Sequence, residues 1–456
     1  MKRILGLILT LVMLMTSVSV LAALEFTVSA EQSYSGTVYY VDADNGDDTN
    51  SGTSQSAAWQ SLEKVNSITL QPGDAVLLKK GCIWTNTFLY PKGEGTASAP
   101  ITISSFGSGD KPMVKSLYDD ELDELPEMDA ALFLKNTSYV IVDGLHITNG
   151  TPGTGAQYVV RVALNNGYTS YGIQIKNCYI NGSNTKNWST ASKSGLSGIT
   201  VSSDTYNGYI GSLLVENNTI VNCKSLGISI NGSVSGSNKD GSINSKSGKN
   251  VVVRGNYLQN IGKDGILVNN CYAPLVEYNT CDKAHSYAQA SAHVAIWPFA
   301  SHSALLQYNE AFNTQTIYDG QGFDCDYQCY NTIFQYNYSH NNEGGFMLIC
   351  CEPTDWNNSY AWNVGSIVRY NISQNDYHYV FSLIGAIDDT QIYNNTIYSK
   401  WALSTSNAYI FYTWTRGASK LTGRSYANNT LIANNIFYTN SLRGDGLANT
   451  TNTTFA

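Results

Sequence analysis

A short phrase centred on asparagine recurs after residue 130, and it restricts the folds open to this chain more than any other feature. It reads VENNTI at 215–220, VEYNTC at 276–281 and IYNNTI at 392–397. The shared asparagines are Asn177, Asn218, Asn256, Asn279, Asn309, Asn337, Asn371, Asn395 and Asn435. The shortest intervals between them are 23 and 24 residues. This repeat length, with β-branched runs and corners rich in Asn or Gly, is typical of a parallel β-solenoid.

Stacked coils of a solenoid bury half of each strand's side chains, because successive residues of a strand point to opposite faces. The shared asparagine fits a turn, where its amide can hydrogen-bond to the asparagine of the next coil. Crossovers between parallel strands are nearly always right-handed, and the Leu-x-x-Leu-x-Leu frame of leucine-rich repeats is absent. We therefore predict an all-β protein, with a right-handed parallel β-helix over residues 116–456.

Residues 31–115 lack the phrase and are expected to form an N-terminal cap and the first coils, with a short helix near Trp59–Val65. Such a cap keeps the first rung of apolar side chains away from water. The acidic loop of this segment contains Asp42, Asp44, Asp47 and Asp48. Calcium could bind there, but Gly46 is one position early for an EF-hand loop, so a solvated turn is favoured.

Residues 1–30 combine a basic start, an apolar run and small residues, which together predict a secretory signal peptide. An uncleaved membrane anchor is the alternative, since the run is long enough to span a bilayer. We expect a secreted monomer that leaves the membrane after signal cleavage. The excess of 35 acidic over 26 basic residues argues against nucleic acid as a partner. Only 13% of residues are charged, so the surface is largely neutral and polar and suits sugars.

Nine cysteines are an odd number for an exported protein, and no two pairs show the spacing of a zinc site. Most are expected to pack as small buried apolar residues. One or two disulfides remain open as an alternative.

Two aspartates stand out in the stretch DGQGFDCDYQC at 319–329. Phe323, Cys325 and Tyr327 alternate there with Asp324 and Asp326, the pattern of a strand with one apolar face and two carboxylates on the other. Aspartate is uncommon in strands, and neighbouring like charges repel. The two aspartates therefore indicate catalysis or cation binding, although a solvated face would also explain them.

An alignment of neighbouring coils on their glycines suggests what surrounds these aspartates. It places Asp324 opposite Met347 in the following coil. In the preceding coil it turns Val294 inward and Ala295 and Trp297 outward. An outward indole would then stand beside the carboxylates.

Three carboxylates are predicted to be catalytic: Asp324, Asp326 and Glu343. Gly344 and Gly345 permit a tight corner after Glu343, so its side chain could lean toward the two aspartates. Hydrolysis of a glycosidic bond needs one carboxyl that protonates the leaving oxygen and another that attacks the anomeric carbon or activates water. Crowding of like charges raises one pKa and keeps that group protonated.

Five residues are predicted to bind substrate: Trp297, His340, Asp319, Glu310 and Trp356. Trp297 and His340 would flank the carboxylates. Trp356 lies in a long insertion, and insertions of this kind often land at the edge of a binding cleft. Packing onto the solenoid explains these aromatic residues equally well.

No lysine or arginine occurs between Lys283 and Arg369, the stretch that contains the predicted site. A polyuronate lyase usually takes its proton with a lysine or arginine and grips the uronates with cations. The sequence therefore favours a hydrolase over a lyase. A hydrolase of this kind is expected to need no cofactor, whereas a lyase would hold Ca²⁺ through Asp324 and Asp326.

The stretches YYVDADNGDDTNSGT, AIWPFASHSALLQYNEA and DGQGFDCDYQCYNTIFQYNYSHNNEGGFMLIC resemble the cap and central coils of secreted right-handed β-helix carbohydrate-active enzymes. That family includes pectate lyases and β-helical glycoside hydrolases, so the resemblance specifies the fold well and the reaction poorly. By resemblance to the hydrolases, Asp324 or Asp326 would be nucleophile or base, and Glu343 the acid/base.

We predict a glycoside hydrolase that cleaves a plant cell-wall polysaccharide, either xylan or a pectin side chain. The first alternative is a calcium-dependent pectate lyase. The second is a non-catalytic carbohydrate-binding solenoid.

Overall fold

The computed structural model describes residues 33–116, 130–149, 157–182, 196–203, 208–286, 292–351, 362–385, 387–400, 409–414, 427–439 and 453–455. The predicted signal peptide and Trp356 lie outside these residues. Ser35–Ala456 form one compact unit. No helix among the described residues is both long and apolar enough to cross a membrane.

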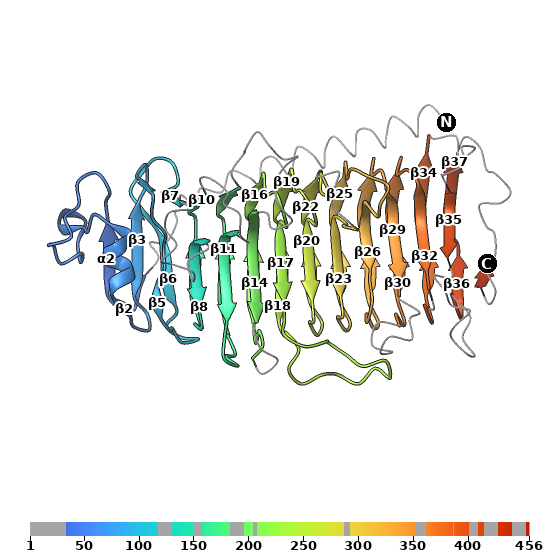
Figure 1. Cartoon of the computed structure of the whole chain (residues 1–456), viewed down its shortest axis with the longest axis horizontal. Coiled ribbons are helices and arrows are strands. Elements are labelled where there is room, and N and C mark those ends of the chain that lie inside the picture. The colour runs from blue at the N-terminus through green and yellow to red at the C-terminus, as the bar shows by residue number, and fades with distance from the viewer. Residues whose placement is uncertain are drawn as a thin grey trace, which may run out of the picture. The chain divides into compact units, whose positions relative to one another are not determined.

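Three long parallel sheets run through this unit, and each central coil contributes one strand to each of them (Figure 1). The 14-stranded sheet contains, in order, β1 (Val38–Val41), β3 (Ala75–Lys79), β6 (Ile101–Phe106), β9 (Val140–Asp143), β12 (Ile173–Lys176), β15 (Leu213–Glu216), β18 (Val251–Arg254), β21 (Leu275–Glu277), β24 (Leu305–Gln307), β27 (Ile333–Gln335), β30 (Ile367–Arg369), β33 (Gln391–Tyr393), β36 (Thr430–Ala433) and β38 (Thr453–Phe455). The predicted parallel β-helix is confirmed.

The two other long sheets follow the same chain order. The 12-stranded sheet contains β4 (Ile83–Thr85), β7 (Met113–Ser116), β10 (His146–Asn149), β13 (Tyr179–Asn181), β16 (Thr219–Val221), β19 (Tyr257–Gln259), β22 (Thr280–Asp282), β25 (Glu310–Phe312), β28 (Tyr338–His340), β31 (Ile372–Gln374), β34 (Thr396–Ser399) and β37 (Ile436–Thr439). The 10-stranded sheet contains β8 (Ala130–Lys135), β11 (Gln157–Leu164), β14 (Leu196–Ser203), β17 (Ile228–Asn231), β20 (Ile266–Asn269), β23 (Ile296–Phe299), β26 (Gln321–Cys325), β29 (Gly345–Cys350), β32 (Tyr379–Ile384) and β35 (Tyr409–Trp414).

The inward side chains of the three sheets form one continuous apolar core. In the central coils this core contains a group of fully buried phenylalanines, Phe323, Phe334, Phe346 and Phe381. Neighbouring rings pack edge to face, as in the pair Phe323 and Phe346, whose centroids lie 6.1 Å apart. A core of this kind makes the strands of the central coils rigid supports for outward side chains.

The shared asparagines form a ladder along the turn between the 14- and 12-stranded sheets. Asn309 is typical: its backbone N and its Nδ2 both donate to Oδ1 of Asn337, at 3.0 and 3.1 Å. Its own Oδ1 accepts the same two bonds from Asn279. The predicted Asn-to-Asn bonding is confirmed, except that Cys178 rather than Asn177 occupies the equivalent turn position and donates to the ladder.

The N-terminal segment contains a 3₁₀ turn (Gln55–Ala57) and the helix α2 (Leu62–Ser67), close to the predicted helix. Two short strands, β2 (Thr69–Leu70) and β5 (Lys92–Gly93), pair beside it. Ser61 caps α2 by accepting from the backbone N of Lys64. Leu62 and Val65 are fully buried in the solenoid core, as expected of a cap.

A candidate active site on the 10-stranded sheet

A pocket of about 170 Å³ opens on the outer side of the 10-stranded sheet, and we call it the carboxylate pocket. It is lined by Ala292, His293, Val294, Trp297, Asp319, Asp324, Asp326, Tyr327, Leu348, Cys350, Ile384 and Trp414. Three of these residues are aspartates, and none is a lysine or arginine. The pocket therefore brings together Asp324, Asp326, Asp319 and Trp297, four of the residues predicted from the sequence.

The three aspartates come from a turn, a strand and the end of that strand. Asp319 and Gly320 both adopt left-handed backbone conformations, with φ of 56° and 72°, in the turn that leads into β26. Aspartate tolerates this region better than most residues. Asp324 points outward from β26 between the core residues Phe323 and Cys325, and Asp326 follows directly after the strand.

Asp324 is the most enclosed of the three carboxyls. Its side chain is 3% exposed, and its Oδ1 has no hydrogen-bond partner. Burial, followed by the nearby charges of Asp326 and Asp319, raises the pKa of Asp324 well above its usual range. Burial therefore favours the protonated form of Asp324, whereas Asp319 and Asp326 are only partly buried and have oxygens that can meet a ligand.

Asp326 has donors on two sides. The backbone N of Tyr327 donates to its Oδ1 at 2.7 Å, and the Cys350 thiol donates to the same oxygen at 3.0 Å. These bonds stabilise the ionised carboxylate. Burial, followed by the charge of Asp326, raises the pKa of Cys350 well above its usual range, so the thiol keeps its proton.

Asp324, Asp326 and Cys350 are close enough to hold a metal ion, with one ligand atom from each within 4.8 Å of the others. The donor set suits calcium poorly, because calcium takes about six to eight oxygen ligands and this group offers a thiol and a protonated carboxyl. A softer metal would have to displace protons from both Asp324 and Cys350.

A fourth carboxylate, Asp264, lies behind one wall of the pocket and hydrogen-bonds to residues of that wall. It is 2% exposed and precedes β20. Its Oδ1 accepts from Val294 N at 2.9 Å and from Trp297 Nε1 at 3.0 Å, and its Oδ2 lies 2.8 Å from His293 Nδ1. Asp264 was not among the site residues predicted from the sequence.

The strand register around Asp324 differs from the prediction by one residue. Asp324 pairs with Leu348, and Met347 pairs instead with Phe323. Adjacent glycines allow two alignments, and burial of Met347 decides between them, because the predicted register would turn Met347 outward beside Asp324. In the preceding coil Ala295 joins the core and Val294 lines the pocket, the reverse of the prediction.

Glu343 does not line the carboxylate pocket, so the expectation that it leans toward the aspartates is wrong. Its exposed carboxylate accepts from Thr316 N at 2.5 Å and so holds the loop that precedes Asp319. Gly344 after it packs against the backbone of Asp319, where a side chain would clash. Glu343 thus supports the turn that carries Asp319.

His340 and Glu310 contact each other but belong to the 12-stranded sheet, on β28 and β25. His340 Nε2 lies 3.2 Å from Glu310 Oε1, and the His340 ring stacks on Phe312. Neither residue lines the carboxylate pocket, so the predicted place of His340 beside the aspartates is wrong, and the structure does not bring Glu310 to them. Trp414, half exposed on β35, does reach the pocket.

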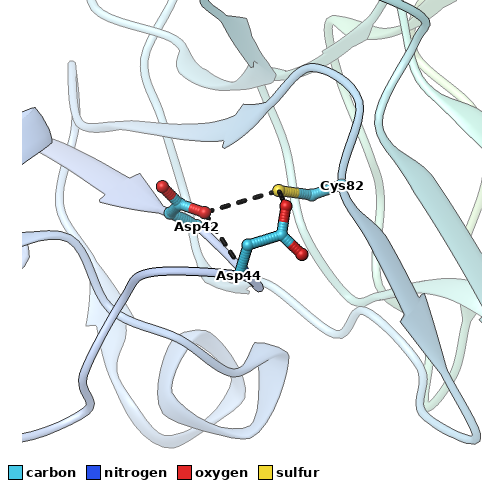
Figure 2. A group of neighbouring side chains, drawn as sticks. All are labelled: Asp42, Asp44 and Cys82. Atoms are coloured by element: carbon cyan, nitrogen blue, oxygen red, sulfur yellow. Dashed lines mark hydrogen bonds between the residues drawn. The ribbon is translucent and has the colours of Figure 1, made fainter.

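The acidic loop of the cap is only partly a solvated turn, because Asp44 and Asp47 are exposed whereas Asp42 is buried. Figure 2 shows Asp42, Asp44 and Cys82 converging, with the thiol 3.5 Å from Asp42 Oδ1 and 3.4 Å from Asp44 Oδ2. Lys79 Nζ already contacts Asp42 at 2.6 Å and neutralises it. Asp48 accepts from Ser61 and helps to fix the start of α2. These carboxylates hold the cap together.

All nine cysteines are free and buried. The expectation that most of them pack as small apolar residues is confirmed, and the alternative of one or two disulfides is not realised in the structure.

Comparisons with known proteins agree with the fold. No protein-family model matches the chain. The chain is similar to lacto-N-biosidases. One from Bifidobacterium longum subsp. longum is 29% identical over 505 aligned residues, which cover 89% of this chain and 31% of that protein. The chain thus spans about a third of the length of this relative.

A solved structure and a second relative extend this similarity. The GH136 lacto-N-biosidase from Eubacterium ramulus is 25% identical, with a TM-score of 0.68 over 89% of this chain and 68% of that one. A stretch of 72 residues, 16% of this chain, is 36% identical to 12% of alpha-1,3-galactosidase A of Akkermansia muciniphila.

Proposed function

We propose that this protein is a glycoside hydrolase of the lacto-N-biosidase type, which releases lacto-N-biose from a larger glycan. The observation that carries the proposal is the carboxylate pocket, where three aspartates meet beside aromatic side chains and where none of the described lining residues is a lysine or arginine. The similarity to lacto-N-biosidases over most of the chain supports the choice of sugar. This substrate replaces the xylan or pectin side chain predicted from the sequence.

In this proposal Asp319 and Asp326 are the carboxyls that touch the substrate. A group that donates a proton to the glycosidic oxygen, or attacks the anomeric carbon, needs an oxygen that the sugar can reach. Asp324 is 3% exposed and its Oδ1 is enclosed, so it offers the sugar less carboxyl surface than the two partly buried aspartates. Its protonated form, which burial favours, lets its two neighbours approach each other with less repulsion.

The aromatic side chains Trp297, Tyr327 and Trp414 form the apolar part of the same pocket. Aromatic faces can stack on the C–H face of a sugar ring, while the carboxylates bind hydroxyl groups. We propose that Trp297 fixes the sugar whose bond is cleaved.

The test is product analysis on p-nitrophenyl lacto-N-bioside and on a panel of xylan, arabinan, rhamnogalacturonan and polygalacturonate, with and without chelator. We expect release of the disaccharide from the first substrate, no unsaturated sugar ends, and the same rate in chelator. Unsaturated ends that vanish with chelator would instead establish a calcium-dependent lyase. Binding without cleavage of any substrate would establish a non-catalytic solenoid.

A further inference from the structure

Asp264 is a buried carboxylate whose hydrogen bonds all go to one wall of the carboxylate pocket. Three groups meet it: Val294 N at 2.9 Å, Trp297 Nε1 at 3.0 Å and His293 Nδ1 at 2.8 Å. Val294, Trp297 and His293 all line the pocket, whereas Asp264 does not. The hydrogen bonds of Asp264 therefore act on a ligand through these three residues, and its charge adds to the raised pKa of Asp324.

Stacking of the coils does not require a carboxylate at this position. Ile266 pairs with Ile228 in the preceding coil and with Ile296 in the following one. Two residues earlier, Asp264 therefore corresponds to Leu226 and Val294, which are both apolar. In the coils before and after, the position equivalent to Asp264 is thus occupied by an uncharged residue.

A buried charge without a partner destabilises the folded protein, so the partners of Asp264 show why a carboxylate is tolerated there. Among the described residues, the titratable side chain that contacts the Asp264 carboxylate is His293, which is 16% exposed. A histidine that donates Nδ1–H to a carboxylate has a fixed ring orientation and a defined tautomer. With Nδ1 bound to Asp264, only Nε2 of His293 is left for a ligand.

We propose that Asp264 is the positioning residue of the carboxylate pocket. It holds His293 with Nε2 available to a hydroxyl group of the sugar, and it fixes the indole of Trp297 for stacking on the ring. This inference rests on the proposed function for its substrate, a neutral glycan, but the geometry of the three bonds does not depend on that function.

The decisive variant is Asp264→Asn. One amide oxygen can still accept from Val294 and Trp297, but the amide NH₂ that then faces His293 Nδ1 forces this nitrogen to become an acceptor. The matched control is Asp376→Asn, which changes another fully buried aspartate, on the turn after the 12-stranded sheet's β31. Circular dichroism and unfolding midpoints would verify that both variants are folded.

The first readout is the ¹⁵N NMR spectrum of the histidine ring nitrogens, with His293→Gln to assign the signals. We expect the Nδ1–H form of His293 in the native protein, the Nε2–H form in Asp264→Asn, and no change in Asp376→Asn. An unchanged tautomer in folded Asp264→Asn would overturn the proposal.

The second readout is the split between kcat and KM on p-nitrophenyl lacto-N-bioside. We expect Asp264→Asn to raise KM by about 10- to 100-fold, the effect of a displacement of about 1 Å in a binding group, with a smaller change in kcat. His293→Gln should raise KM similarly, and the double variant should be little worse than either single one. Equal losses in Asp376→Asn, or an unchanged KM in folded His293→Gln, would overturn the proposal.

The two proposals can fail separately. If the native protein cleaves none of the glycans but Asp264→Asn changes the tautomer of His293, the hydrolase is refuted and the positioning of His293 by Asp264 is supported. A native protein that cleaves the lacto-N-bioside while Asp264→Asn alters neither readout would support the hydrolase and refute the role of Asp264.

Discussion

The thiol of Cys350 lies 3.0 Å from Asp326 Oδ1 and links the carboxylate after β26 to the last residue of β29 in the next coil. Two residues before Asp326, burial raises the pKa of Asp324 and favours its protonated form. The end of β26 and the residue after it therefore carry two carboxyls in different environments, one bonded by donors and one enclosed. Such a difference in environment between neighbouring acids is a common feature of hydrolytic sites.

Removal of the carboxylates that reach the pocket should abolish turnover and leave the fold intact. We expect Asp326→Asn and Asp319→Asn each to lower kcat by roughly 10²- to 10⁴-fold, the usual contribution of a general acid or base. Steady-state kinetics on p-nitrophenyl lacto-N-bioside measures this. Asp282→Asn, on the 12-stranded sheet, is the control and should retain native activity. Retention of more than a tenth of the activity by both pocket variants would remove them from the mechanism.

Glu343→Gln should behave quite differently from these variants. The glutamine oxygen can still accept from Thr316 N, which is the contact that the carboxylate makes in the structure. We expect kcat/KM within about threefold of the native value, because Glu343 supports a turn and does not line the pocket. A loss of kcat/KM as large as that in Asp326→Asn would show that Glu343 takes part in catalysis.

The solenoid and its asparagine ladder could be predicted because both follow from a pattern that recurs along the coils, and Asp324 and Asp326 could be predicted because they are unusual residues in a strand pattern. Asn309 and its neighbours occupy one turn position in every coil, so a single phrase defines the fold. The alternation around Asp324 likewise shows which face of the strand it occupies. Periodic features of this kind survive an error in any one coil.

What the sequence did not reveal depends on side-chain direction and on loops. Glu343 is close to Asp319 in space, but its side chain turns to Thr316, and no residue pattern records that choice. Glu310 and His340 lie in the same coils as the pocket but on another sheet. Asp264 did leave a signal, since it is charged where the neighbouring coils have Leu226 and Val294.

The asparagine ladder should be a major source of stability for the central coils. Asn309 is fully buried, and its Nδ2 donates to Val276 O as well as to Asn337. Asn309→Ala would leave several buried polar groups without partners, at about 1–3 kcal/mol each. We expect urea unfolding to show a loss of about 3 kcal/mol or more in the free energy of unfolding. Gln335→Ala, a partly exposed control on the 14-stranded sheet, should lose less than about 1 kcal/mol. Equal losses in the two variants would contradict a special role for the ladder.

A second buried acid, Asp376, makes the stability of the protein depend on pH. Burial raises the pKa of Asp376 from its usual value of 3.8 to about 7, against the lowering effect of hydrogen bonds from Ser373, Ser339 and Asn342. Between these two pH values the folded protein keeps a proton that the unfolded chain has lost. The free energy of unfolding therefore falls as pH rises from about 4 to 7 and levels off above 7, by at most about 4 kcal/mol from this group.

Asp376→Asn removes this titration and keeps the contacts. The amide oxygen can accept from Asn342 N and Nδ2, as Asp376 Oδ1 does now, and the amide NH₂ can donate to Ser373 Oγ. We expect urea midpoints of the native protein to fall between pH 4.5 and 7.5 and those of the variant to fall less. Asp324, whose pKa is also raised, contributes to the slope in both proteins, so the difference between the two curves isolates Asp376. Parallel curves would show that Asp376 is ionised in the folded protein across this range, because only a carboxyl that holds its proton can produce the difference.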